Sequence, residues 1–199
     1  MRKKARLLCL ALAVVLILLA GCGNQTPQAD STLGPYELSQ EQEELLELLG
    51  LSGTVGVVAF TGPEEATALS IDTYALQDGQ WQATGGGQLS REEAGEPWEG
   101  LAAIQSREDY SIGLRVRTEG IASYTTDAAA PESDPQGWAL QFLDEETPIV
   151  LGEPAPVALF LYSGDGSLRT HALTDFADPA AFDGEGLALV QAVTLTFTA

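Results

Sequence analysis

Cysteine and histidine are scarce in this sequence. Both cysteines, Cys9 and Cys22, lie within the first 22 of 199 residues, so the rest of the chain has no thiol and cannot form a disulfide. Thiol catalysis, thiolate metal sites and redox switching are therefore excluded from residues 23–199. His171 is the single histidine, which excludes a zinc site built from several histidine or cysteine ligands.

Cationic side chains are also few. Residues 22–199 contain five arginines and no lysine against all 29 acidic residues, a net charge of −24 at neutral pH. Such a surface repels phosphate backbones, so nucleic-acid binding is excluded. The hydrophobic content of 45% is too high for a wholly disordered acidic chain, and the length suits one domain with its own core.

The amino terminus has the layout of a secretory signal peptide. Four basic residues lie among residues 2–6, and the apolar run from Leu7 to Leu19 carries no charge. A spanning helix needs about 20 apolar residues, so this run is short for a permanent membrane anchor.

The end of this segment, Leu19-Ala20-Gly21-Cys22, resembles the lipobox of bacterial lipoproteins. The resemblance implies that the Cys22 sulfur receives a diacylglyceryl group, that the chain is cut before Cys22, and that the new amino terminus can be acylated. Two or more acyl chains would hold the protein durably on a bilayer. We therefore expect an extracytoplasmic protein that is lipid-anchored to the bacterial cell membrane.

The remainder divides into a tether and a domain. Residues 22–35 are rich in small and polar side chains and have one large apolar residue, Leu33, which predicts a flexible tether. Residues 36–199 are predicted to form a single β-rich domain. The expected organisation is a signal peptide over residues 1–21, a tether over 22–35 and a domain over 36–199.

One helix is predicted, over about residues 37–49. Ser39 is a suitable N-cap, Gln42 is placed to complete a capping box, and Gly50 suits a left-handed C-terminal cap. Leucines at positions 45, 48 and 49 share one face, which predicts a helix packed on a sheet.

Short β-type runs separated by turn residues follow. The expected strands cover residues 54–60, 71–77, 80–83, 110–118, 121–126, 157–162, 167–173 and 187–197. Asp78-Gly79 predicts a two-residue hairpin turn between the second and third of these, and residues 163–166 predict a second hairpin loop. In the last strand, Leu187, Leu189, Val193, Leu195 and Phe197 are expected on one face. Long loops are expected at 85–100, 127–136 and 175–186.

This pattern predicts a mainly β protein, an antiparallel β-sandwich or jelly-roll-like domain with one N-terminal helix. Helices that could form the crossovers of a parallel sheet are absent from the pattern. Strand order cannot be derived from the sequence.

Several acidic groups could carry chemistry. Glu92, Glu93, Glu96 and Glu99 surround Trp98 on the predicted 85–100 loop, either as an acidic site with an aromatic platform or as a solvated loop held to the core by its tryptophan. Asp175, Asp178, Asp183 and Glu185 are candidate ligands for a structural calcium ion. Asp165 is more simply a turn former.

Three further residues are candidates. Arg115 and Arg117 point to the same side of one strand, where they could pair with neighbouring acids or hold a ligand carboxylate or phosphate. His171 is the one possible base for a serine triad, but no Gly-x-Ser-x-Gly motif is present, so an ordinary strand histidine is favoured.

Two functions are consistent with these observations. The first is a membrane-anchored, non-catalytic binding or assembly module of the cell envelope, which would bind an envelope protein, a peptide or a glycan through exposed aromatic side chains such as Trp98 and Trp138. The alternative is a cell-envelope hydrolase that acts on a glycan with carboxylates or a bound metal. A solute-binding protein with two α/β lobes does not fit this β-rich pattern.

Overall fold

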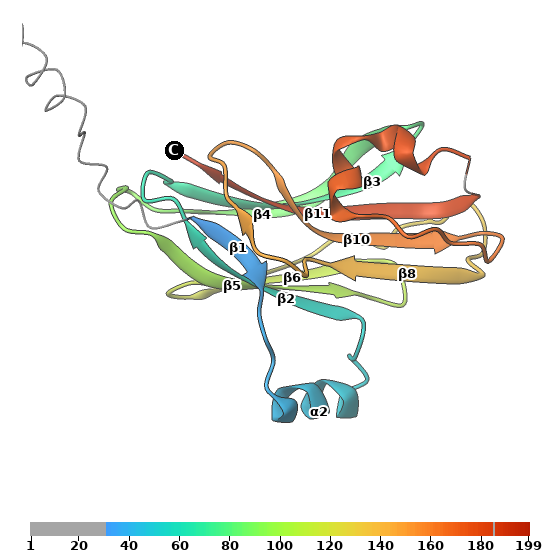
Figure 1. Ribbon diagram of the computed structural model, residues 1–199, viewed down its shortest axis with the longest axis horizontal. Coiled ribbons are helices and arrows are strands. Elements are labelled where there is room, and N and C mark those ends of the chain that lie inside the picture. Colours follow the sequence, from blue (N-terminus) through green and yellow to red (C-terminus); the bar gives the residue numbers. More distant parts are fainter. Residues whose placement is uncertain (1–30, 185) are drawn as a thin grey trace, which may run out of the picture.

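A computed structural model describes residues 31–184 and 186–199. These residues fold into strands with one α-helix and two short 3-10 helices (Figure 1). In chain order the elements are β1 (Thr32–Pro35), α2 (Gln40–Leu48), β2 (Val55–Gly62), β3 (Ala68–Gln77), β4 (Gln80–Ser90), β5 (Trp98–Ser106), β6 (Ile112–Arg117), β7 (Ile121–Thr125), β8 (Gly137–Phe142), β9 (Thr147–Pro148), β10 (Ala155–Ser163), η1 (Leu173–Ala177), η2 (Pro179–Phe182) and β11 (Leu187–Thr198).

The strands form two antiparallel sheets that pack as a sandwich, as predicted. One sheet has six strands in the order β7-β6-β5-β2-β1-β9, and the other has five in the order β4-β3-β11-β10-β8. The main core lies between them and includes Phe60, Ile104, Phe160 and Phe197, each at most 3% exposed. Alternation along β6, where Ile112, Leu114 and Val116 are buried and Arg115 and Arg117 exposed, matches the sequence prediction.

The predicted hairpin between residues 71–77 and 80–83 is confirmed. Gln77 pairs with Gln80 across the turn, and both turn residues adopt positive φ, 51° at Asp78 and 70° at Gly79. Positive φ at both positions is the requirement of a type I′ turn, which an Asp-Gly pair meets at low cost. The strand β4 continues to Ser90, so residues 85–90 belong to the sheet and the loop expected at 85–100 is shorter.

The predicted strand at 167–173 is wrong. Both edges of β10 already pair, with β11 on one side and β8 on the other, so no edge remains for a hairpin partner. Residues 167–172 instead lead into η1 and η2, which cover part of the outer face of the five-stranded sheet (Figure 1). Leu173 and Phe182 pack there against Leu159 and Leu161 and form a second hydrophobic cluster.

Two smaller differences also have structural causes. Leu187 packs in this second cluster rather than in the core with Leu189, because a β-bulge interrupts the pairing of β11 with β10 at this point. Residues 32–35, expected in the tether, form β1, because Leu33 is buried in the core at 1% exposure. The predicted signal peptide and the rest of the predicted tether, residues 1–30, lie outside the described residues.

The helix forms where it is predicted but does not pack on a sheet. Ser39 and Gln42 make the expected capping box, and Gly50 adopts φ of 68°. However, α2 lies in the connection between β1 and β2 and projects from the sandwich, so Leu45, Leu48 and Leu49 are 55%, 84% and 60% exposed (Figure 1). The i, i+3, i+4 spacing predicts an apolar helix face correctly, but it does not say what covers that face.

Candidate functional site

An open groove lies at one end of the sandwich and contains Trp138, one of the predicted binding residues. Its volume is about 770 Å³. Its walls come from β8, β10, the β5–β6 turn and the segment after α2, and consist of Gly50, Leu51, Thr54, Gln105, Ser106, Arg107, Glu108, Asp109, Tyr110, Trp138, Leu140 and Tyr162. We call it the Trp138 groove.

The groove exists because one sheet extends past the other. Trp138 on β8 pairs directly with Tyr162 on β10, so both side chains are on the inner face of the five-stranded sheet. Tyr162 is buried in the core, whereas Trp138 is 60% exposed. An inward-facing indole with this exposure marks the point where the opposing sheet has ended.

The floor of the groove is aromatic and its polar groups are paired. The Tyr162 and Ser106 hydroxyls form a hydrogen bond of 2.7 Å, and the Tyr110 ring packs edge-on against the Tyr162 ring at 5.0 Å between centroids. Burial raises the pKa of Tyr162, so its phenol remains neutral and available for hydrogen bonding.

The β5–β6 turn holds Tyr110 in an uncommon backbone conformation. Its φ of 61° lies in the left-handed region, which non-glycine residues rarely adopt. Asp109 fixes the turn by accepting hydrogen bonds from the Ser111 backbone N–H (3.1 Å) and hydroxyl (2.6 Å), and the Gln191 side chain donates to the Tyr110 carbonyl. Strain of this kind persists where surrounding contacts enforce it and is common at binding sites.

The hydrogen bonds from the hydroxyl and the backbone N–H of Ser111 lower the pKa of Asp109 below its usual 3.8. The stability that this carboxylate contributes is therefore fully present above pH 3.8 and is lost as the pH falls through the lower folded-state pKa. We expect the Asp109 carboxyl signal in an NMR titration to have its midpoint below 3.8, and Ser111→Ala to move that midpoint upward. An equal midpoint in the two proteins would contradict the role of the Ser111 bonds.

The second predicted aromatic, Trp98, is not an exposed loop residue. It begins β5 and is only 7% exposed, and its indole N–H donates to the Ala66 carbonyl at 2.8 Å. The Arg91 guanidinium lies 5.1 Å above its ring and donates to the Ala66 and Glu64 carbonyls. The interpretation of an acidic loop held to the core by its tryptophan therefore fits the structure.

A second groove of about 780 Å³ nevertheless runs beside Trp98, and we call it the Trp98 groove. Glu96, Glu99 and Glu119 line it and are all exposed to solvent. The sequence group around Trp98 thus contributes two carboxylates, Glu96 and Glu99, to one concave surface. Glu92 and Glu93 do not line this groove.

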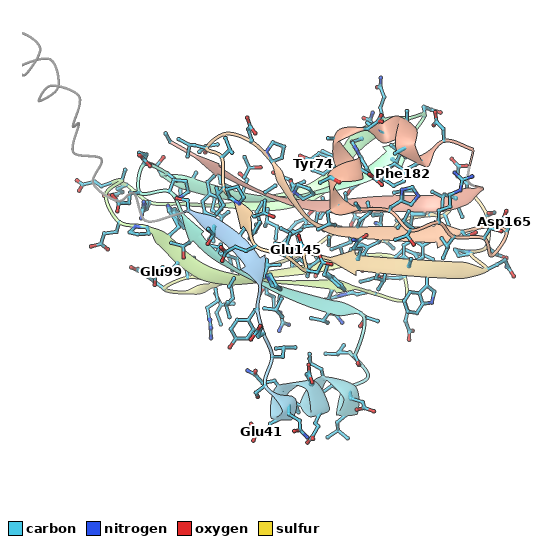
Figure 2. The ribbon with its side chains drawn as sticks, in the orientation of Figure 1. Glu41, Tyr74, Glu99, Glu145, Asp165 and Phe182 are labelled. Atoms are coloured by element: carbon cyan, nitrogen blue, oxygen red, sulfur yellow. The ribbon has the colours of Figure 1, made fainter. Side chains whose placement is uncertain are left out.

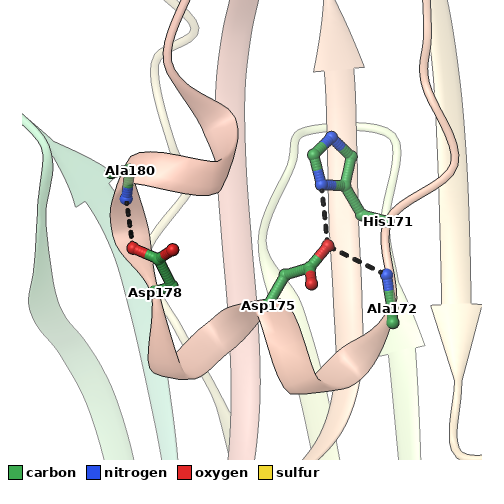
Figure 3. Close-up of polar contacts among 5 residues, drawn as sticks. All are labelled: His171, Ala172, Asp175, Asp178 and Ala180. Atoms are coloured by element: carbon green, nitrogen blue, oxygen red, sulfur yellow. Dashed lines mark hydrogen bonds and ion pairs between the residues drawn. The ribbon is translucent and has the colours of Figure 1, made fainter.

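The predicted calcium ligands cap the two 3-10 helices (Figure 3). Asp175 accepts hydrogen bonds from the Ala172 N–H and from His171 Nδ1, each at 3.1 Å, and Asp178 accepts from the Ala180 N–H. Asp183 is the C-cap of η2, and Glu185 lies outside the described residues. Among the described residues, no three histidine, cysteine, aspartate or glutamate side chains are placed to hold one metal ion, and the calcium site stays a prediction.

His171 is not on a strand. It lies between β10 and η1, is 6% exposed, and stacks on the Phe182 ring at 4.6 Å between centroids. Its bond to Asp175 ties the chain to the first turn of η1. The nearby Ser163 hydroxyl donates to Asp165 instead, so the serine–histidine arrangement considered from the sequence is not formed with Ser163.

Arg115 and Arg117 lie side by side on the outer face of β6, as predicted, and both are exposed. Within residues 31–184 and 186–199, neither guanidinium makes an ion pair. The expected pairing with neighbouring acids is therefore not found there.

The sequence did not indicate Tyr110, Tyr162 or Ser106 as site residues. Ser106 ends β5 and Tyr110 lies four residues later in the β5–β6 turn, whereas Tyr162 lies on β10 in the other sheet. Only the packing of the two sheets brings Tyr162 to the other two residues. The one local signal was the polar Asp109-Tyr110-Ser111 turn between two apolar strands.

Comparison with known proteins finds no match among protein-family models, curated proteins or solved structures. None of the helices within the described residues combines the length and the apolar character needed to cross a bilayer.

Proposed function

We propose that this protein is a lipid-anchored, extracytoplasmic binding module of the cell envelope that holds a glycan in the Trp138 groove. The observation that carries this proposal is the exposed Trp138 indole on the wall of a large open groove. Large, well-formed concave sites with aromatic walls and a few polar groups are the usual form of a ligand site.

The chemistry of the groove suits a sugar ring. One face of such a ring is apolar C–H surface, and its edge is a row of hydroxyl groups. The Trp138 and Tyr110 rings offer flat apolar contact area, while Arg107 and Gln105 offer hydrogen-bond donors and acceptors nearby. The Tyr162–Ser106 pair is already satisfied, so the floor does not have to reorganise on binding.

The placement of the groove is compatible with a membrane anchor. The described chain enters β1 at one end of the sandwich, and β8, which carries Trp138, begins at the opposite end (Figure 1). Thr32 is ten positions after Cys22, a reach of at most about 35 Å. A bilayer attached through Cys22 would therefore leave the groove facing away from the membrane.

The hydrolase alternative rests on the Trp98 groove, which gathers three glutamates. A glycosidase needs one carboxylic acid whose pKa is raised so that it can protonate the leaving group. Burial is the usual cause of such a shift, and Glu96, Glu99 and Glu119 are exposed. Release of soluble sugar from purified peptidoglycan by the native protein, and its loss in Glu99→Gln, would establish the alternative.

Replacing Trp138 by alanine tests the binding function. We expect the protein to co-sediment with purified, protein-free peptidoglycan, and Trp138→Ala to weaken this binding about tenfold or more, because a buried aromatic contact dominates small interfaces. Ile121→Ala is the matched control, since Ile121 is also exposed but lies on β7, outside the groove. Equal binding by the Trp138 variant and native protein, or no binding by either, would refute the proposal.

A further inference from the structure

The outer face of the six-stranded sheet carries a patch of partly exposed apolar side chains bordered by arginine. Val57 and Ala59 on β2 and Leu101 and Ala103 on β5 point outward and are only half-buried. Strand pairing places these residues in two rows, one running from Arg117 to Leu101 and Ala59, the other from Arg115 to Ala103 and Val57. We call these six residues the Arg face.

A third arginine extends this border. The Arg107 guanidinium lies over Gly113, where an added Cβ atom would be only 3.1 Å from it. Gly113 is on the same side of β6 as Arg115 and Arg117. Three of the five arginines of residues 22–199 thus line one strand of a strongly acidic protein. Small residues such as Ala59 and Ala103 leave room beside them for a closely packed helix.

The helix α2 has the complementary surface. Its positions 41, 44, 45 and 48 follow the i, i+3, i+4, i+7 spacing of one helix face. This face therefore carries two glutamates, Glu41 and Glu44, and two leucines, Leu45 and Leu48. Figure 2 shows Glu41 projecting away from the sandwich. The leucine–glutamate face of α2 is therefore turned outward, away from the chain's own sheet.

We propose that the leucine–glutamate face of α2 docks on the Arg face of a second copy of this chain, in a reciprocal two-fold dimer. Leu45 and Leu48 would cover the small apolar side chains, and Glu41 and Glu44 would pair with Arg115 and Arg117. Figure 1 shows α2 below the layer containing β2, β5 and β6, with β3, β10 and β11 above that layer. The helix and the Arg face thus lie on the same side of the molecule, as a two-fold interface requires.

A second copy fits better than the chain's own helix. Both ends of the α2 segment are tied to the six-stranded sheet: the Tyr36 N–H donates to the Val57 carbonyl, and the Ser106 N–H donates to the Thr54 carbonyl. These bonds hold α2 away from its own sheet. A bilayer fits less well, because the glutamates of α2 project from the same side and would meet the lipid phosphates first.

Charge reversal tests the dimer in solution. The sandwich and its two hydrophobic clusters lie within residues 31–199, so residues 22–199 with Cys22→Ser form a suitable soluble protein. We expect sedimentation equilibrium to show a dimer above roughly 100 μM protein. The buffer should contain about 0.15 M salt, because the short Debye length at this concentration screens charges that are not in close contact. Arg115→Glu/Arg117→Glu and Glu41→Arg/Glu44→Arg should each weaken association about tenfold or more.

Mixing the two variants provides the decisive control. Each sheet would then face a helix of opposite charge, so the mixture should regain dimer of near-native affinity. Glu43→Arg/Glu47→Arg makes the same charge change on the opposite side of α2 and should leave association within a few-fold of native. All substituted residues are exposed, and circular dichroism should show unchanged melting.

Three outcomes would overturn the proposal. A native protein that is monomeric at every concentration would show that the Arg face has no second copy as its partner. A dimer unaffected by both charge reversals would place the interface elsewhere. A monomer that sediments with anionic phospholipid vesicles only when Arg115 and Arg117 are present would assign the Arg face to the membrane. None of these outcomes depends on whether the Trp138 groove binds a glycan.

Discussion

Replacing Trp98 by alanine is expected to lower the free energy of unfolding by about 3–5 kcal/mol, the usual cost of removing a buried aromatic side chain. The ring is 7% exposed and packs in the main core, and its loss would leave the Ala66 carbonyl without the indole donor. The Arg91 guanidinium would also lose the ring beneath it. Small domains are stable by only about 5–15 kcal/mol, so the variant should be close to unfolding.

Urea denaturation followed by circular dichroism measures this effect. Trp138→Ala is the matched control, because it removes the same side chain from a position that is 60% exposed, and we expect it to cost less than about 1 kcal/mol. Similar midpoints for the two alanine variants would contradict the structural role assigned to Trp98. They would reopen the sequence hypothesis that Trp98 serves as an exposed platform for a ligand.

Replacing Cys22 by alanine is expected to abolish the acyl anchor that would hold the chain on a membrane. The proposed anchor consists of acyl chains on the Cys22 sulfur and amino group, and each buried methylene contributes about 0.8 kcal/mol. Without that sulfur no thioether can form, and residues 23–199 carry no other thiol that could replace it. The variant should therefore remain in the soluble fraction or retain its uncut leader.

Fractionation of cells that express the full chain, followed by mass spectrometry, measures this outcome. Cys9→Ala is the matched control, because Cys9 lies inside the apolar run that would be removed. We expect that variant to partition as the native chain does. A native chain whose Cys22 thiol is unmodified, or a Cys22→Ala chain that is processed normally and still partitions fully with membranes, would refute the lipid anchor.

The successful sequence predictions concern features that depend on neighbours along the chain. The Asp78-Gly79 turn, the alternation along β6 and the Ser39–Gln42 capping box each involve a few consecutive residues whose conformational preferences agree with the final fold. The failures concern competition between distant segments. Residues 167–173 have strand-like composition, but β8, from an earlier part of the chain, occupies the edge of β10 that they would need.

The predictions about the candidate site also fail where contacts between distant segments decide the outcome. Trp98 is buried and Trp138 is exposed, and the neighbouring residues in the sequence do not predict this difference. Trp98 is buried because β5 lies inside the six-stranded sheet, whereas Trp138 is exposed because β8 is an edge strand that outruns the opposing sheet. The leucine face of α2 was predicted from its spacing, but its exposure follows from how β1 and β2 hold the connecting segment.

The sequence by itself therefore determined the acidic charge, the absence of thiol chemistry beyond Cys22, the strand-rich fold class and the turn of the most regular hairpin. Only the tertiary structure decided the strand order, the Trp138 groove and the Arg face. The physical reason is that turns, caps and side-chain alternation are set by short-range backbone preferences. A groove or an uncovered face depends instead on where two sheets end relative to each other, which is a balance of contacts between residues far apart in the chain.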